Sequence, residues 1–286
     1  MNFLKSVFVP MYMMGLMGIT FYAGWRLAEG ANPLAWIGVL LTTGPFFLVL
    51  AWVMMVKNVA RTSARFPFLI LLGAVGSGLA FLADDADHLA STLAAAGWMG
   101  FLVYAFWYSS YGRRPSERLK MGARLPDFTL QNSEGSRVGS AMLSARPSIL
   151  IFFRGNWCPF CMAQAKELAA RYNELGRLGV RVAMIAPQPL ENTQALARKF
   201  GAAIDFYTDD GNAAARKLGI AQKWGVPMGM QMLGYDSETV LPTVIITGHG
   251  GQVIWVHETD NYRVRPEPDT YFDVLRQHGL TLASAT

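Results

Sequence analysis

The residues of this chain that are best suited to chemistry are two cysteines, the only two among 286 residues. Cys158 and Cys161 form a single C-x-x-C. Residues 147–154 before them are predicted to form a buried strand, and residues 162–178 after them a helix. The cysteines should therefore lie at a helix N-terminus, where free N–H groups and the helix dipole favour an anion. Since the thiolate is the nucleophile, this pattern predicts a redox-active dithiol.

The order of the two cysteines predicts their roles. Cys158, nearer the start of the helix, is expected to be the nucleophile, and Cys161, one turn further in, the resolving cysteine. Pro159 suits the first helical turn because it needs no N–H partner there. Arg154 could add positive charge if its side chain points toward the sulfur.

Half of a zinc site and a pair of inert buried cysteines are the alternative interpretations of this motif. A zinc site needs a second pair of ligands, but the chain has no third cysteine. His249 and His257 are not spaced as a partner motif. No glycine-rich loop follows a strand with the spacing of a nucleotide site. We therefore predict no metal and no bound cofactor.

The residues around the cysteines resemble the thioredoxin superfamily. The stretch 152–161, Phe-Phe-Arg-Gly-Asn-Trp-Cys-Pro-Phe-Cys, is similar to the peroxiredoxin-like branch, the redoxin or AhpC/TSA-like proteins with an R-G-x-W-C-P-x-C signature. The resemblance extends from Gly122 to about Leu280. It implies an α/β thioredoxin-like fold with a central mixed sheet flanked by helices. Leu241-Pro242-Thr243 is a second landmark, which implies a cis proline against the cysteine pair. The residues expected to support the cysteines are Trp157, Pro159, Arg154, Pro242 and Thr243.

Two departures from these relatives affect the expected activity. Phe152 stands where thioredoxins usually carry a buried aspartate, and Gly155 stands where typical peroxiredoxins place Thr or Ser before the reactive cysteine. The resemblance therefore implies first a thiol–disulfide oxidoreductase that acts on a protein disulfide, and second an antioxidant peroxide reductase. Either enzyme would need a thiol electron donor that the sequence does not identify. A scaffold or assembly subunit of a membrane complex is the third interpretation.

Two further segments are expected near the cysteines. Residues 260–266 resemble a stretch of the same redoxin branch. Arg263 or Arg265 is therefore expected either to reach the thiolate or an anionic substrate, or to make structural ion pairs or face water. Residues 220–240 mix Met, Trp and Gly just before Pro242. They are expected to form either an adaptable apolar surface for a protein substrate or a packed surface loop.

The N-terminal part of the chain has a different composition. Mean hydropathy is +0.24 with only 16% charged residues, because residues before about 112 are overwhelmingly apolar. Four apolar runs, each close to the ~20 residues that a bilayer core needs, predict an all-α four-helix transmembrane domain. The predicted spans are residues 7–25, 34–56, 66–83 and 89–111. The predicted organisation is a membrane domain over 1–112, a basic juxtamembrane linker over 113–124 and a thioredoxin-like domain over 125–286.

Charged residues near the ends of these runs predict the orientation. The net charge of +5 arises largely from basic residues at the edges of apolar segments, so membrane topology explains it better than nucleic-acid binding. One side of the predicted membrane domain carries most of the basic residues: Lys5, Lys57, Arg61, Arg65, Arg113, Arg114, Arg118, Lys120 and Arg124. The opposite side carries Arg26 and the acidic residues Asp84, Asp85 and Asp87. The positive-inside rule then places both termini and the redoxin domain in the cytoplasm, with the bacterial inner membrane as the expected location. The expected partners are the substrate, the thiol donor, the lipid bilayer and possible membrane proteins.

Overall fold

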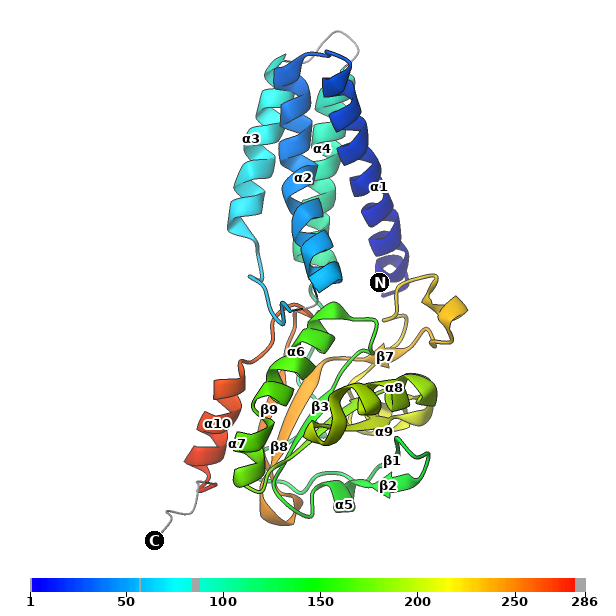
Figure 1. The fold of residues 1–286 in the computed structure, drawn as a ribbon, viewed down its shortest axis with the longest axis vertical. Helices are drawn as coiled ribbons and strands as arrows, with labels where there is room; N and C mark the ends of the chain where they lie inside the picture. The colour runs from blue at the N-terminus through cyan, green and yellow to red at the C-terminus, as the bar shows by residue number, and fades with distance from the viewer. Residues whose placement is uncertain (1, 57, 84–87, 281–286) are drawn as a thin grey trace. The chain divides into compact units, whose positions relative to one another are not determined.

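The computed structural model of the chain describes residues 2–56, 58–83 and 88–280 and divides it into two compact units (Figure 1). The first unit contains the N-terminal helices up to Tyr111. The second contains residues 58–61 and everything from Gly112 onward. Lys57, Asp84, Asp85 and Asp87, on which the predicted topology partly depends, lie outside the described residues.

The described residues of the first unit form four apolar helices. Their bounds are Asn2–Ala28 for α1, Pro33–Val56 for α2, Pro67–Ala83 for α3 and Leu89–Leu102 for α4, which continues as a π-helix, η1, over Val103–Tyr108. Three stretches, α1, α2 and Leu89–Tyr108, are long and apolar enough to cross a membrane. Helix α3 has 17 residues, so its length is about 25 Å against a hydrocarbon core of about 30 Å. The third predicted span is therefore a helix, but a shorter one than the others.

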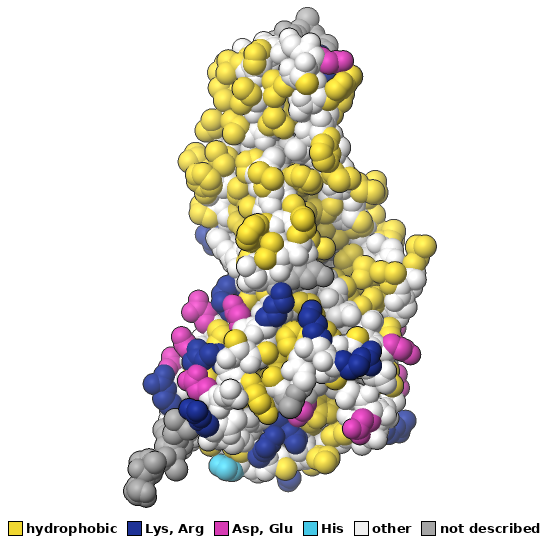
Figure 2. Space-filling model, in the orientation of Figure 1, with side chains coloured by type: hydrophobic (Ala, Val, Ile, Leu, Met, Phe, Trp, Pro, Cys, Tyr) yellow, Lys and Arg dark blue, Asp and Glu magenta, His cyan; other side chains and the backbone are white. Residues whose placement is uncertain are grey.

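The surfaces of the two units differ in chemistry. Figure 2 shows hydrophobic side chains over the helices of the first unit, whereas Lys, Arg, Asp and Glu side chains gather on the second. Helices α2 and α3 pack closely because glycines face each other. A Cβ atom on Gly76 would lie 2.6 Å from the carbonyl oxygen of Gly38. Small residues at such crossings are typical of helices that pack within a membrane.

A mixed seven-stranded sheet forms the centre of the second unit, in the order β2-β1-β5-β4-β3-β8-β9. The strand bounds are Thr129–Asn132 for β1, Arg137–Gly139 for β2, Ser148–Phe152 for β3, Arg181–Ala186 for β4, Asp205–Thr208 for β5, Thr243–Thr247 for β8 and Val253–Glu258 for β9. Strands β3, β4 and β5 are parallel, and β8 pairs antiparallel with β3 and β9. A separate two-stranded ladder joins β6, Ala221–Gln222, to β7, Thr239–Val240.

Helices cover both faces of this sheet. Their bounds are Ser140–Leu143 for α5, Pro159–Ala170 for α6, Tyr172–Arg177 for α7, Leu190–Phe200 for α8, Ala213–Lys217 for α9 and Pro268–Gln277 for α10. The predicted helix over 162–178 is interrupted at Arg171, whose φ of −101° and ψ of 9° separate α6 from α7. The predicted thioredoxin-like fold, a mixed sheet flanked by helices, is confirmed.

Side chains along each strand alternate between the two faces of the sheet, so their contacts show which helices cover which face. Leu150 and Ile245 belong to a buried cluster that includes Ala214 and Leu218 of the α9 region, so α9 covers that face. The opposite face carries Trp255, whose ring packs edge-on against Tyr271 of α10. The Tyr271 hydroxyl accepts a hydrogen bond of 2.9 Å from Gln164 of α6. Helices α6 and α10 are therefore packed together over the second face, and α6 carries the cysteines.

Residues 113–124, predicted as a linker, pack on the second unit. The Arg113 guanidinium donates hydrogen bonds of 3.0 Å to the Pro242 carbonyl and 3.0 Å to the Thr243 hydroxyl. Leu119 is buried in the same cluster as the α9 residues. This segment is thus bound to the sheet at the start of β8 rather than being a free spacer.

Candidate active site

The two cysteines lie at the N-terminus of α6. Cys158 is the N-cap residue and Pro159 occupies the first helical turn. Both thiols are free, and both residues are buried, with 1% of Cys158 and none of Cys161 exposed. The Cys158 N–H donates to the Gly155 carbonyl at 3.2 Å, and the Met162 N–H donates to the Cys158 carbonyl at 3.1 Å. The backbone therefore fixes Cys158 at the junction between loop and helix.

The surroundings of the two thiols separate their acidities. A hydrogen bond from the Cys161 thiol lowers the pKa of Cys158 from 9.0 to about 6, against the opposing effect of burial. The positive charges of Arg154 and Arg265 act in the same direction. Burial, followed by the same hydrogen bond, raises the pKa of Cys161. At neutral pH the pair is thus a Cys158 thiolate with a protonated Cys161 beside it, as a nucleophile and its resolving partner require.

We expect the alkylation rate of Cys158 to rise with pH through a midpoint near 6 and to be level above about pH 7.5, because only the thiolate reacts. The measurement is iodoacetamide labelling of the reduced chain across pH, read by mass spectrometry of the peptide that carries Cys158. The same depressed pKa means that the contribution of this thiolate to stability is present above the unfolded pKa and is lost as pH falls through 6. A midpoint near that of a free thiol would contradict the arrangement.

Arg154 supplies positive charge from the end of β3. Its guanidinium lies 4.7 Å from the ring centroid of Trp157 and 5.5 Å from that of Tyr262, as cation–π contacts do. It also donates a hydrogen bond to the Gly225 carbonyl. Arg154 is buried, so its charge acts on Cys158 with little screening by water.

Arg263 and Arg265 are both buried, so the alternative in which they face water is wrong. The Arg265 guanidinium contacts the Cys161 sulfur at 3.6 Å. The backbone N–H of Arg263 donates to the Asn261 side chain at 3.0 Å. Arg265 thus lies beside the cysteine pair.

Gly155 adopts a backbone that other residues avoid, with φ at +142°. A Cβ atom there would lie 2.6 Å from Nε1 of Trp157. This loop therefore requires glycine at the position where typical peroxiredoxins carry Thr or Ser. As a result, residue 155 provides no hydroxyl group to Cys158.

We expect Gly155→Ala to lower the free energy of unfolding by about 1–3 kcal/mol, because alanine is strained at this φ and displaces the Trp157 ring. The measurement is chemical denaturation of the full chain in detergent, followed by tryptophan fluorescence. Gly176→Ala in α7 is the matched control, since its φ is ordinary and no atom lies within 4 Å of the added Cβ. Equal stability of the two variants would argue against strain at Gly155.

Pro242 and Thr243 lie beside the cysteine loop, because Thr243 pairs with Phe152 at the end of β3. No peptide bond between described residues is cis. The implied cis proline is therefore wrong for this structure, and the bond before Pro242 is trans. The hydrogen bonds from Arg113 hold the Pro242 carbonyl and the Thr243 hydroxyl in this conformation.

The AhpC/TSA family matches residues 121–256, which include both cysteines and Pro242. Residues 121–256 form an AhpC/TSA redoxin domain. Arg263 and Arg265 lie beyond the matched residues.

Curated relatives of the redoxin domain are two proteins named putative peroxiredoxin bcp from Helicobacter pylori. The protein of strain 26695 is 26% identical over 99 residues, which cover 35% of this chain and 65% of the relative. That of strain J99 is 28% identical over 78 residues, which cover 27% of this chain and 51% of the relative. The chain thus spans between half and two thirds of the length of these relatives.

Solved structures similar to the redoxin domain include two from bacteria. Peroxidoxin BcpB from Mycobacterium tuberculosis is 18% identical with a TM-score of 0.47, covering 56% of this chain and 97% of that chain. AhpC from Enterococcus faecalis is 16% identical with a TM-score of 0.46, covering 57% of this chain and 98% of that chain.

The structure adds polar residues that the sequence did not single out. The Asn156 N–H donates to the Gln188 side chain at 2.9 Å, and the Tyr235 hydroxyl donates to the Asn156 side-chain oxygen. Asn192 in turn donates to the Tyr235 hydroxyl at 3.0 Å. Gln188 lies two residues after β4, and the carboxyl ends of parallel strands share one edge, so its position was a usable signal. Tyr235 belongs to the segment 220–240 that was expected near the cysteines, but nothing distinguished it within that segment.

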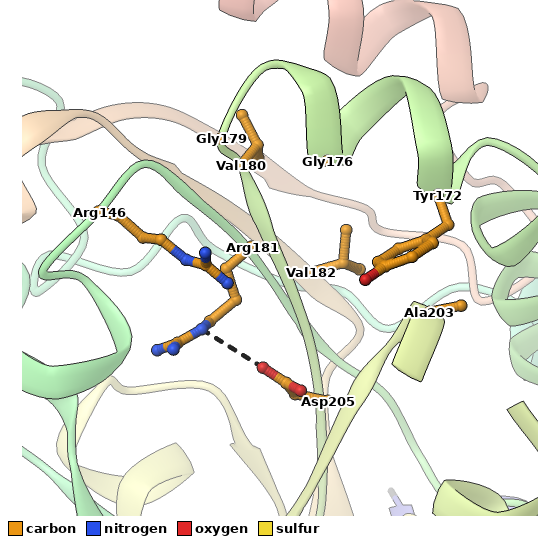
Figure 3. Close-up of a pocket in the computed structure, with 9 residues that line it drawn as sticks. All are labelled: Arg146, Tyr172, Gly176, Gly179, Val180, Arg181, Val182, Ala203 and Asp205. Carbon is orange, nitrogen blue, oxygen red and sulfur yellow. Dashed lines mark ion pairs between the residues drawn. The ribbon is translucent and has the colours of Figure 1, made fainter. Parts of the chain in front are cut away.

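Two hollows among the described residues of the redoxin domain bear on the site. One of about 390 Å³ is lined by residues that follow β4 and β5, including Gln188, and so lies on the cysteine edge of the sheet. The other, of about 180 Å³, holds Arg146, Tyr172 and Arg181, with Arg181 paired to Asp205 at 3.3 Å (Figure 3). Arg181 begins β4, whereas the cysteines follow the end of the parallel strand β3. The second hollow is therefore at the opposite edge and separate from the cysteine site.

Proposed function

We propose that this chain is a membrane-anchored thiol peroxidase that reduces a small peroxide with Cys158 and Cys161. The observation that carries the proposal is a thiolate of lowered pKa that is almost fully buried. A small peroxide can reach such a sulfur through a minor opening, whereas a protein disulfide must bring two sulfurs and their chains within bonding distance. The names of the curated relatives, putative peroxiredoxins, support the same reaction class.

The two-cysteine chemistry balances within one helical turn. The Cys158 thiolate attacks one oxygen of the peroxide, the O–O bond breaks, and the leaving alkoxide or hydroxide takes a proton from solvent. Cys158 is then a sulfenic acid. The Cys161 sulfur attacks it, forms the S–S bond and releases water, with the Cys161 proton going to the departing oxygen. A thiol electron donor then returns the disulfide to the dithiol by exchange, and the donor is oxidised.

Arg265 fits the second step. Its guanidinium contacts the Cys161 sulfur at 3.6 Å, so it stabilises the thiolate character that Cys161 gains as it attacks. Arg154 acts on the first step, because its charge favours the Cys158 thiolate. We assign Trp157, Pro159, Pro242 and Thr243 to positioning these groups rather than to bond-making.

Thiol–disulfide exchange is the second candidate, and one observation favours it. Among the described residues no hydroxyl group contributes to the lowered pKa of Cys158, and the hydroxyl of nearby Thr243 bonds to Arg113 and to the Leu241 carbonyl. The sequence-based prediction placed exchange first, and we propose peroxide reduction ahead of it because Cys158 is buried. A non-catalytic scaffold in a membrane complex is the remaining alternative.

We further propose that the redoxin domain is held at the cytoplasmic face of a bacterial inner membrane by the apolar helices. The three stretches long and apolar enough to cross a membrane support the anchor. The basic residues before and after these stretches support the orientation. A reporter fused to the C-terminus tests this arrangement, because activity only in the periplasm would reverse the orientation.

The experiment that tests the peroxidase is stopped-flow oxidation of the reduced full chain in detergent. Hydrogen peroxide and a model protein disulfide are compared at equal concentration, and tryptophan fluorescence and thiol content report the oxidation. Peroxide oxidation far faster than that of a free thiol is the expected result. Fast exchange with slow peroxide reaction would favour the second candidate, and no reaction with either would favour the scaffold.

A further inference from the structure

An exposed apolar loop lies beside the cysteine site. Residues 224–235 form a twelve-residue stretch with no charged side chain. Its large apolar side chains are open to the surroundings, with 49% of Trp224, 48% of Met228, 91% of Met232 and 66% of Leu233 exposed. Exposed apolar groups gathered in one segment mark a surface that contacts another phase or molecule.

Both ends of this loop are bound to the residues that lead into the cysteine motif. At one end, the Gly225 carbonyl accepts a hydrogen bond from Arg154. At the other, the Tyr235 hydroxyl donates to Asn156. The turn η4, Met230–Leu233, lies between these two attachments. The loop is therefore a fixed neighbour of Cys158, not a remote surface feature.

A short connection joins the last candidate span to the cysteine edge of the domain. Tyr108 ends the last stretch that is long and apolar enough to cross a membrane. Arg113 is bound to Pro242 and Thr243 and forms a buried ion pair with Glu258, all on the cysteine edge of the sheet. Only residues 109–112 separate Tyr108 from Arg113. Even when fully extended, this connection measures about 18 Å from Tyr108 to Arg113.

We propose that residues 224–235 are a lipid-contacting surface that rests in the headgroup–acyl boundary of the bilayer beside the cysteine pair. Trp and Met side chains suit that boundary, because their apolar bodies lose contact with water there. Lys223 before the loop and the exposed Arg114 in the connection place positive charge at its margin, where anionic headgroups attract it. A protein partner could also cover an apolar loop, but the short connection argues for lipid. This inference rests on the proposed membrane anchor and is independent of the proposed reaction.

The test places a fluorescent probe at single positions in the full chain with Cys158→Ser and Cys161→Ser. An environment-sensitive probe is attached at Met232→Cys in the loop, and the protein is reconstituted in nanodiscs of phosphatidylcholine and phosphatidylglycerol. Lipids brominated near the headgroup or near the bilayer centre then quench the probe according to depth. We expect loss of fluorescence with the shallow bromines and little with the deep ones, as for a group about 5–10 Å into the boundary.

Two matched positions make the result decisive. Met142→Cys is an exposed methionine of α5, near the start of β3 and so on the edge away from the cysteines, and it should show no quenching. Leu48→Cys in α2 is exposed within a candidate span and should be quenched most by the deep bromines. Equal quenching at Met232 and Met142, or none at Met232 while Leu48 is quenched, overturns the lipid contact. Absence of quenching at Leu48 overturns the anchor and this proposal together, while peroxide kinetics remain a separate test of the reaction.

Discussion

Cys158→Ser is expected to lower the rate of peroxide reduction by about a thousandfold or more, because the variant lacks the sulfur that forms the first new bond. Cys161→Ser should behave differently. It keeps the Cys158 sulfur and a hydroxyl that can donate a hydrogen bond to it, so one round of oxidation should proceed while turnover with a thiol donor stops. The measurement is peroxide consumption by the full chain, with single-turnover oxidation followed in parallel.

Trapping the oxidised product separates the two roles. In Cys161→Ser the Cys158 sulfenic acid should persist and react with dimedone, whereas the native chain should give the Cys158–Cys161 disulfide and no adduct. Far-UV circular dichroism of each variant serves as the control for folding. Peroxide oxidation of Cys161 in Cys158→Ser as fast as that of Cys158 in Cys161→Ser, read as dimedone adducts, would contradict the assignment of nucleophile and resolving cysteine.

Arg154→Met is expected to slow peroxide reduction by about tenfold at pH 6, because loss of a nearby positive charge raises the pKa of Cys158. The difference in rate between the variant and the native chain should shrink as pH rises toward 9, because Cys158 is then deprotonated even without the charge of Arg154. The variant also leaves the Gly225 carbonyl without its donor, which is expected to cost about 1–3 kcal/mol of unfolding free energy. The pH profile of the oxidation rate distinguishes the electrostatic effect from this structural one.

Two further substitutions control for charge and for generic damage. Arg154→Lys keeps the positive charge but lacks the planar guanidinium group. The pH midpoint of its oxidation rate should therefore stay closer to that of the native chain than the midpoint of Arg154→Met does. Arg181→Met removes a partly buried arginine at the opposite edge of the sheet and should leave the midpoint unchanged. A shift in Arg181→Met as large as that in Arg154→Met would show that the effect is not local to the cysteines.

Much of the secondary structure could be predicted, because it depends on residues that are close together in the sequence. The apolar run before the cysteines and the amphipathic helix after it predicted the strand-to-helix junction, and β3 and α6 form there. The apolar runs predicted over 34–56 and 66–83 are found as α2 and α3. Such patterns depend on neighbours within one or two turns, which the sequence displays directly.

The details of the candidate site were less predictable, because they depend on residues far apart in the chain. Arg265 reaches Cys161 across 104 positions, and nothing in the irregular segment around it distinguished it from Arg263. The attachment of Arg113 at Pro242 spans 129 positions and turned a predicted linker into part of the domain. Hydrogen bonds between distant segments follow from the packing of the whole sheet, not from local spacing.

The sequence alone thus predicted the dithiol as the reactive group, placed it at a helix N-terminus, and indicated that the chain carries apolar helices of membrane length. Only the tertiary structure decided how accessible Cys158 is, which arginine lies beside Cys161, and that an exposed apolar loop is bound to the cysteine motif. Composition and periodicity specify secondary structure, but burial depends on what the rest of the chain packs against a side chain. Here burial of the reactive sulfur is what favours a small peroxide over a protein disulfide.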